Sequence, residues 1–340
     1  MRKRNRYILC IAVIVCVFLI NYFVSIPEEE IIKEKYKGII QFYDIATPTV
    51  LGNDFSVIST ICEEFSEGLE FSFVKLNKIN SITPTETYLS VQQNADIIRY
   101  DPSLTDMNTV MTDSEFTASM KKAYPEIPVK SDTGKVIVPY WYDIYVIILN
   151  RDLLEKEEID FRGDITRDSL CAVISSAYEK GGEEYLGYSS GKAKDLLFDK
   201  RYPTAVANEY DLFGDESRSI SEFAEGEIVL YLGTLKDVAY LQRQIKRGKN
   251  ICSYDVQLYP ADEEVMYISE IGCYAFRECE DVKKKELLLD IAEYLHSYDA
   301  MKYTENLGML AWIPYEEIQY EKYPYLREFA YFEGRRIPVE

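Results

Sequence analysis

VIVPYWYDIYVIILNRDLLEK, residues 136–156, is the stretch that decides the fold. A proline is followed by three aromatic residues and an acid, and the chain then becomes apolar until Asn150. The apolar residues 145–150 predict a buried β-strand, and the residues after Asn150 predict a helix or turn. Residues 140–143 combine the aromatic content of a buried strand with the polarity of a loop, so their role depends on the elements around them.

Strands and helices alternate on the N-terminal side of this stretch. We expect strands over 38–46, 69–77 and 95–101, and helices over 54–67 and 84–94. This alternation is typical of an α/β fold with a mostly parallel sheet, whose ligands bind at the loops after the carboxyl ends of the strands. The residues at these loops are Tyr43, Asp44, Tyr100 and Asp101.

A second α/β region follows residue 156. We expect a helix over 166–182, a strand over 227–233, a helix over 234–248, a strand pair or one bent strand over 266–277, and a long and a short helix over 280–308. No internal repeat or glycine-rich linker separates two independent domains. Two lobes built from interleaved segments fit this pattern better.

The composition excludes several classes of function. Of the 340 residues 47% are hydrophobic, enough to build real cores, and the net charge is −20. Nucleic-acid binding needs a basic surface, and the only basic run lies within the first six residues. The sequence carries no phosphate-binding loop, hydrolase motif or zinc spacing. We therefore expect no cofactor and no metal.

Residues 1–27 have the pattern of a signal sequence or a membrane anchor. Basic residues precede the apolar run 8–24, which is at the short end of the lengths that span a bilayer as a helix. Cleavage after Ser25 would leave Phe23 at a position that favours a small residue, so we expect an uncleaved anchor rather than a cleaved or lipidated form. The body would then lie on the extracytoplasmic face of the plasma membrane, or be secreted if the segment were cut.

Four segments, taken in order, resemble a known family. They are ADIIRYDP at 95–102, the stretch quoted above, SISEFAEGEIVLYLGTLKDVAYLQ at 219–242 and KKKELLLDIAEYLHSYDAMKYTENLGMLAWIPYEEI at 283–318. Together they resemble the extracellular solute-binding proteins of ABC importers, family 1, which includes the maltose and other sugar receptors. Each segment alone is weakly specific, and the ordered set covers most of residues 38–318.

This resemblance implies a bilobed α/β fold of the periplasmic-binding-protein type II, in which a hinge of several strands joins two lobes. Lobe one would comprise residues 38–143 and 265–309, and lobe two residues 144–264 and 310–340. A small polar ligand, in this family a carbohydrate, would bind between the lobes and be delivered to an ABC permease. The resemblance implies no enzymatic activity.

By the same resemblance, residues 140–143 would be both hinge and cleft floor. A sugar needs flat aromatic surfaces for its C–H faces and polar groups for its hydroxyls. The predicted ligand-binding residues are the aromatic residues Trp141, Tyr142, Trp312, Tyr43, Tyr100 and Tyr231 and the acids Asp44, Asp101, Asp143 and Glu270. Two departures bear on the ligand: Thr234 follows Gly233 with no aromatic residue after it, and Gly272 lacks the second glycine that often precedes this strand.

Two other functions remain open on the sequence. The ligand could be an amino acid or another small polar solute, and the same fold could serve as a sensor or adaptor for a membrane kinase. An enzyme is disfavoured because adjacent acids such as Glu63 and Glu64 point apart, and the single histidine, His296, cannot build a metal site. We expect His296 at the surface or near a helix end.

Overall fold

The structure is a computed structural model. It describes residues 39–43, 64–65, 72–75, 96–100, 137–161, 163, 165–196, 212–214, 218–260, 265–276, 280–313 and 315–339. The expected N-terminal anchor, the helix at 84–94 and most of the helix at 54–67 lie outside these residues. Of the helices that the structure describes, none has both the length and the apolar character needed to cross a membrane.

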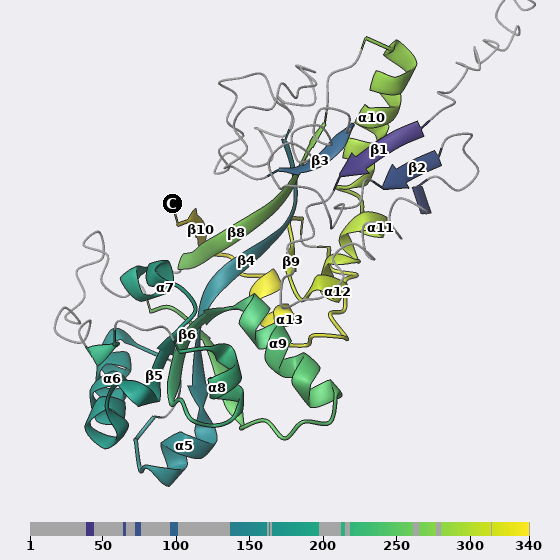
Figure 1. Ribbon diagram of the computed structural model, residues 1–340. Coiled ribbons are helices and arrows are strands. Elements are labelled where there is room, and N and C mark those ends of the chain that lie inside the picture. Colours follow the sequence, from purple (N-terminus) through teal and green to yellow (C-terminus); the bar gives the residue numbers. More distant parts are fainter. Residues whose placement is uncertain are drawn as a thin grey trace, which may run out of the picture.

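Two long strands run between two smaller α/β regions (Figure 1). They are β4 (Ile137–Asn150) and β8 (Val265–Phe276), and they pair antiparallel over residues 137–144 of β4. Both strands are about twice the usual length of a strand in a globular protein. Each region therefore receives one half of the same two strands.

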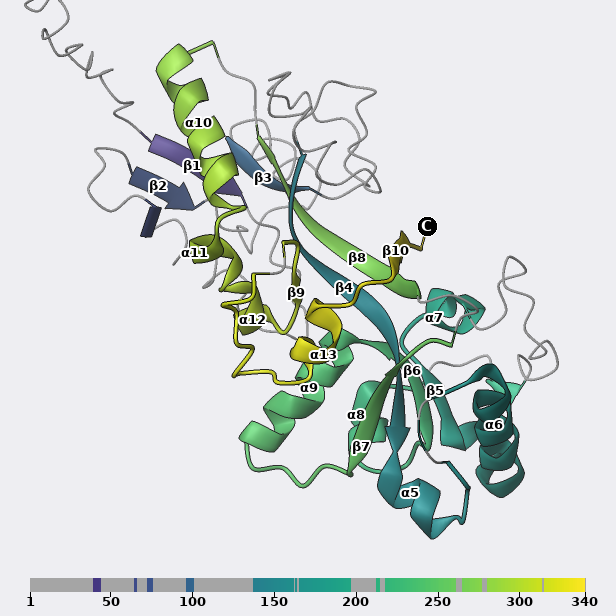
Figure 2. The same ribbon diagram turned by 180° about the vertical axis from the view of Figure 1, so that it is seen from behind.

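The first region contains a short parallel sheet. Its strands are β1 (Ile39–Tyr43), β2 (Ser72–Lys75) and β3 (Ile97–Tyr100), in the order β2-β1-β3. β3 then pairs antiparallel with the carboxyl end of β8. The helices that follow β8 are α10 (Val282–Tyr294), α11 (Tyr298–Met301) and α12 (Thr304–Leu307), and α10 lies beside β1 in both views (Figures 1 and 2).

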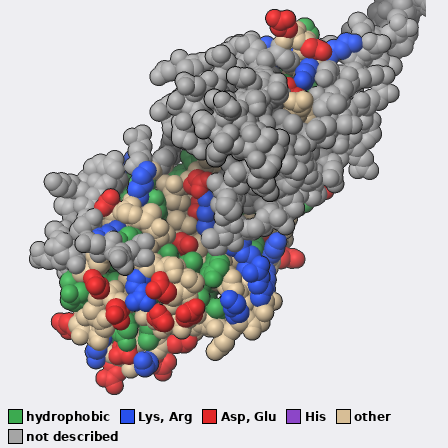
Figure 3. All heavy atoms as spheres, viewed as in Figure 1, with side chains coloured by type: hydrophobic (Ala, Val, Ile, Leu, Met, Phe, Trp, Pro, Cys, Tyr) green, Lys and Arg blue, Asp and Glu red, His purple; other side chains and the backbone are tan. Residues whose placement is uncertain are grey.

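The second region is built around the other half of β4. Its strands are β5 (Leu186–Tyr188), β6 (Leu230–Thr234) and β7 (Tyr254–Leu258), and the order is β5-β6-β4-β7. Its helices are α5 (Arg151–Lys156), α6 (Arg167–Gly181), α7 (Gly191–Leu196), α8 (Ile220–Ala224) and α9 (Leu235–Lys246). Acidic and basic side chains are mixed on the described face of this region in Figure 3.

The C-terminal segment returns to the two long strands. β9 (Leu310–Ala311) pairs with β4, and β10 (Arg335–Pro338) pairs parallel with β8. Between them lies α13 (Leu326–Ala330), which is close to α9 in Figures 1 and 2. Three distant parts of the sequence therefore meet where the two regions are joined.

Side chains of β4 alternate between two hydrophobic clusters. Val146 and Ile148 point into one cluster, and Ile147 and Leu149 point into the other. The first cluster reaches from the first region to α9 and α13, whereas the second is made mainly by residues of the second region. Burial on both faces explains why the segment 145–150 has an almost uninterrupted apolar sequence.

Asn150 ends β4 and begins α5. Its Oδ1 accepts a hydrogen bond from the backbone N–H of Leu153 at 3.0 Å, and its Nδ2 donates to the carbonyl of Ile228 at 3.1 Å. The side chain is fully buried, so both of its polar groups need these partners. Asn150 in the quoted stretch is therefore a helix cap that also holds β4 to the segment before β6.

Most expected elements are confirmed within the described residues. Residues 140–143 continue β4. Irregular pairing after Pro139 and Asp143 accommodates a proline that cannot donate a ladder hydrogen bond. Residues 265–276 form one strand rather than a pair. The segment 280–308 holds one long helix and two short ones, and ends as expected at Gly308, whose φ of 72° suits glycine.

Candidate functional site

The candidate site lies where β4 changes its neighbours. Up to Ile144, β4 pairs with β8 and, at residues 141–142, also with β9. It pairs with β6 from Tyr145 onward and with β7 from Val146 onward. Consecutive side chains of residues 141–143 therefore contact elements from different parts of the sequence.

Trp141 packs against Gly272, its partner across the β4–β8 ladder. A Cβ at position 272 would overlap the indole ring, so the ring occupies the space that the glycine leaves. Lys236 Nζ lies 5.1 Å from the centroid of the same ring, which is a cation–π contact. Trp141 is only 3% exposed, so its aromatic surface is covered in this conformation.

Lys236 also forms an ion pair with Glu270. Lys236 is the second residue of α9 and Glu270 lies in β8, so the pair joins a helix of the second region to a crossing strand. The two side chains are 19% and 44% exposed. An ion pair this accessible is screened by salt and is weak enough to break and re-form.

The side chain of Asp143, a buried residue of β4, lies next to the first residue of α9. Its Oδ1 accepts hydrogen bonds from the backbone N–H groups of Leu235 at 3.0 Å and Ile144 at 2.9 Å. Burial raises its pKa to about 6, while the charge of Lys236 acts in the opposite direction. The carboxylate therefore holds the first residue of α9 to the crossing strand, and its expected contact with a ligand stays a prediction.

A second carboxyl group, that of Asp237, closes the amino end of α9. Its Oδ2 accepts a hydrogen bond from the backbone N–H of Thr234 at 2.9 Å, in a capping box. The residue as a whole is half-buried, but protein surrounds the carboxyl group, and this desolvation raises its pKa to about 7. The nearby charge of Asp143 raises the pKa further. Two acids with raised pKa values thus flank Lys236.

Tyr142 and Trp312 contact each other on the opposite face of β4. Their ring centroids are 5.9 Å apart and the planes are inclined by 82°, an edge-to-face arrangement. The guanidinium of Arg336 lies 5.8 Å from the Tyr142 ring centroid, and burial raises the pKa of Tyr142. Because successive strand residues point to opposite faces, this aromatic pair and Trp141 do not form one continuous surface.

Tyr231 lies away from the crossing. It is 3% exposed, and its ring centroid is 6.1 Å from that of Phe223, inside the cluster around α8 and α9. A Cβ at Gly187 would come within 2.8 Å of the Tyr231 ring. The structure thus places Tyr231 in the core of the second region.

The predicted residues of the first region are only partly described. The backbones of Tyr43 and Tyr100 end β1 and β3, but their side chains, and all of Asp44 and Asp101, lie outside the described residues. The backbone of Tyr100 pairs with Cys273, which is next to the glycine that contacts Trp141. The sheet therefore brings the carboxyl end of β3 to the crossing.

Sequence reasoning did not single out Lys236 or Asp237. The capping pattern of residues 234–237 was the signal for Asp237, but nothing in the sequence places Lys236 over a tryptophan. His296 follows the end of α10, as expected, but points inward, with Nε2 2.7 Å from the carbonyl oxygen of Pro139. Burial lowers the pKa of His296. The neutral ring therefore donates this hydrogen bond to β4.

No protein-family model matches the sequence, and no curated protein matches it. Solved structures do match. A sugar transporter of Rhizobium etli in an open conformation has a TM-score of 0.63 at 11% identity over 88% of both chains. The apo form of RafE from Streptococcus pneumoniae has a TM-score of 0.61 at 12% identity over 88% of both chains.

A third structure, the cyclic α-maltosyl-1,6-maltose binding protein of Arthrobacter globiformis, has a TM-score of 0.59 at 13% identity, over 89% of this chain and 88% of that one. Likeness at such low identity establishes the fold alone. The chain has the fold of the solute-binding proteins of ABC importers, which confirms the fold expected from the four sequence segments. The Rhizobium etli structure is that of a sugar transporter, and the Arthrobacter globiformis structure is that of a binding protein.

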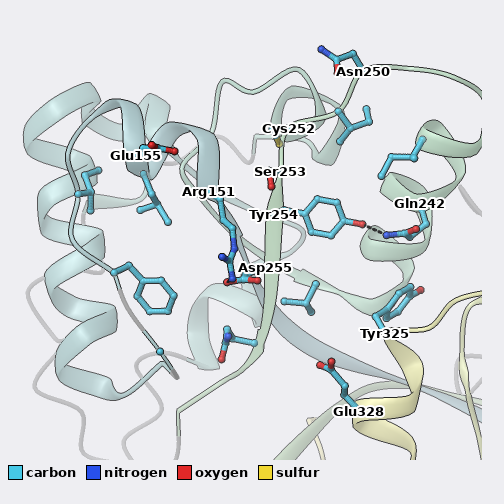
Figure 4. Close-up of a pocket in the computed structure, with 18 of the residues that line it drawn as sticks. Arg151, Glu155, Gln242, Asn250, Cys252, Ser253, Tyr254, Asp255, Tyr325 and Glu328 are labelled. Carbon is cyan, nitrogen blue, oxygen red and sulfur yellow. Dashed lines mark hydrogen bonds and ion pairs between the residues drawn. The ribbon is translucent and has the colours of Figure 1, made fainter.

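A groove of about 1300 Å³ lies elsewhere in the described part of the chain, along the outer edge of β7 (Figure 4). None of the residues at the crossing lines it. The crossing carries the candidate ligand site because the aromatic, acidic and basic side chains of both regions meet there. The groove is a separate feature of the second region.

Proposed function

We propose that the chain is an exported solute-binding protein that captures a small polar ligand, a carbohydrate, between two lobes and delivers it to an ABC permease. The observation that carries the proposal is the meeting of Trp141, Lys236 and Glu270 where the two regions join. The fold shared with sugar-binding proteins supports it. Residues 1–27 would hold the body at the extracytoplasmic face of the membrane.

Lobe one would comprise residues 38–143 and 265–309, and lobe two residues 144–264 and 310–340. β4 and β8 would then form the hinge, because both strands extend from one region into the other. A ligand between the lobes stabilises the closed state to the extent that it makes more contacts there than in the open state. The Lys236–Glu270 pair is suited to respond, since its members belong to different elements at this hinge.

The residues at the crossing supply both kinds of contact that a sugar needs. The indole of Trp141 offers an apolar face, and Lys236 and Glu270 can donate to and accept from hydroxyl groups. Lys236 now covers that ring, so a ligand reaches Trp141 only after the ammonium group moves aside. Cation–π contacts and accessible ion pairs are each worth about 1 kcal/mol or less, which a bound sugar can replace.

Isothermal titration calorimetry of the full-length chain in detergent tests the proposal. We expect saturable binding of at least one neutral oligosaccharide from a panel that includes raffinose and maltose, and no binding of amino acids. Binding of an amino acid alone would assign a different solute class. If neither the oligosaccharides nor the amino acids bound, the result would contradict solute capture.

Uptake of the bound sugar by cells separates an importer component from a sensor. Deletion of the gene should abolish uptake of the radiolabelled sugar that binds in calorimetry. Unchanged uptake together with intact binding would favour a sensor or adaptor that acts with a membrane kinase.

A further inference from the structure

The groove along β7 has two walls of different origin (Figure 4). One wall is formed by α5 and the segment after it, and the other by α9 and α13. β7 runs between them as the floor. In the close-up the ring of Tyr254 points to the α9 wall, where its hydroxyl accepts a hydrogen bond from Gln242.

The floor of the groove is a strand edge that no other described strand pairs with. Among the described residues, β7 pairs only with β4. The backbone N–H of Arg151 donates to the carbonyl of Ser253 at 2.8 Å. In an antiparallel pair every second residue bonds to the same neighbour, so the backbone groups of Asp255 also point toward β4. The N–H and C=O groups of Tyr254 and Val256 consequently point into the groove. No backbone hydrogen bond between described residues uses them.

The walls offer apolar contacts on both sides of this edge. Ile245 on the α9 wall is 44% exposed and offers an aliphatic contact. Phe161 and Leu154 line the opposite wall. Side chains that alternate along an added strand would therefore meet apolar surface on either side.

The charge of the groove is negative. Its lining holds the acids Glu155, Asp160, Asp255 and Glu328 and the bases Arg151 and Lys249. Arg151 is paired with Asp255, and Glu155 and Glu328 are both exposed. In Figure 4 the carboxylates of Glu155 and Glu328 lie on opposite sides of β7. An occupant with basic side chains complements this arrangement.

We propose that the groove binds an extended segment of a partner protein, with apolar and basic residues on both of its faces, as an additional strand on the edge of β7. Backbone groups of Tyr254 and Val256 supply the main-chain hydrogen bonds, and Glu155 and Glu328 select basic side chains. A strand of about five residues spans roughly 17 Å, which suits the length of β7. This site does not depend on solute capture, because it shares no residue with the crossing.

Fluorescence anisotropy with a labelled peptide, Lys-Lys-Val-Val-Lys-Lys-Val-Val with blocked ends, which carries lysine and valine on both faces of a strand, tests the proposal on the full-length chain in detergent. We expect saturable binding, about tenfold weaker binding when alternate backbone amides are N-methylated, and no binding when glutamate replaces lysine. N-methylation leaves the side chains and their charge unchanged. Equal affinity of the methylated peptide, or absence of binding of the first peptide, would overturn the proposal.

Two variants locate the binding. Val256→Pro removes an N–H that faces the groove and should weaken the peptide about tenfold while the fold is kept, because proline is tolerated at strand edges. Glu328→Gln should also weaken it, whereas Glu293→Gln, the same change at an exposed position of α10, should not. Unaltered binding to both groove variants would place the peptide elsewhere. If sedimentation shows self-association that Val256→Pro abolishes, the occupant is a second copy of this chain and the proposal is wrong.

Discussion

The carboxylate of Asp143 accepts a hydrogen bond from the backbone N–H of Leu235 at 3.0 Å, which joins the crossing strand β4 to the first residue of α9. The next residue of the helix is Lys236, which lies over Trp141 and pairs with Glu270. One buried contact thus positions the residues that would meet a ligand. Its chemistry can be tested without knowledge of the ligand.

Asp143→Ala should lower the free energy of unfolding by about 1–3 kcal/mol near neutral pH, because it leaves two buried backbone N–H groups without their acceptor. Asp143→Asn keeps an oxygen at that place and removes a buried charge, so it should cost less. Urea denaturation followed by circular dichroism measures both variants. If both variants lowered the free energy of unfolding equally, the two hydrogen bonds would not explain how Asp143 contributes to stability.

The raised pKa of Asp237 makes a prediction about pH. A carboxyl group whose pKa rises on folding, here to about 7, adds stability that is fully present below its unfolded pKa and is lost as the pH rises through 7. Asp237→Asn resembles the protonated form at every pH. Its free energy of unfolding relative to the unaltered protein should therefore increase between about pH 4 and pH 8, as urea denaturation across this range can show.

Glu293→Gln is the matched control for this pH series, because it removes an exposed acid far from α9. Its stability difference from the unaltered protein should change little with pH. A difference for Asp237→Asn that stays constant, or decreases as the pH rises, would contradict the raised pKa.

Gly272→Ala should lower the free energy of unfolding by about 1–3 kcal/mol, since the added methyl group overlaps the Trp141 ring in a closely packed site. Gly191→Ala provides a comparison: no atom lies within 4 Å of the methyl group it adds, and the residue begins α7. Thermal or urea unfolding of the two variants distinguishes them. Similar stability of both would show that the indole ring is not held against position 272.

His296 should titrate with a pKa below 6.5, because burial disfavours the imidazolium while the Pro139 carbonyl only partly compensates. The chain contains one histidine, so a single imidazole resonance in an NMR titration reports it. With a lowered pKa, its contribution to stability is present above pH 6.5 and is lost as the pH falls through the folded value. A measured pKa at or above 6.5 would contradict burial as the dominant effect on the ring.

The α/β regions could be predicted because their elements follow local rules. The helices α6 and α9 have apolar residues at helical spacing and capping residues at their first turn, and both form where expected. The continuous strand through residues 140–143 could not be predicted in the same way. Pro139 and Asp143 interrupt the local pattern, and the strands that pair with this segment come from residues more than a hundred positions later.

For the candidate site, the sequence predicted residue types better than their arrangement. Trp141, Asp143 and Glu270 do come together at the crossing, and Tyr142 contacts Trp312 on the other face. Lys236 was missed because the sequence pattern predicts that a lysine in the first turn of an amphipathic helix is exposed to solvent. Its place over Trp141 depends on the angle between α9 and β4, which only the folded chain specifies.

Tryptophan fluorescence tests the central claim most directly. The chain has two tryptophans, so in a Trp312→Phe variant the emission comes from Trp141 alone. We predict that an oligosaccharide which binds in calorimetry changes this emission saturably, with the same dissociation constant, and that Trp141→Ala abolishes its binding. Saturable sugar binding that leaves the emission of Trp141 unchanged, or that persists in Trp141→Ala, would contradict a ligand site at the crossing of β4 and β8.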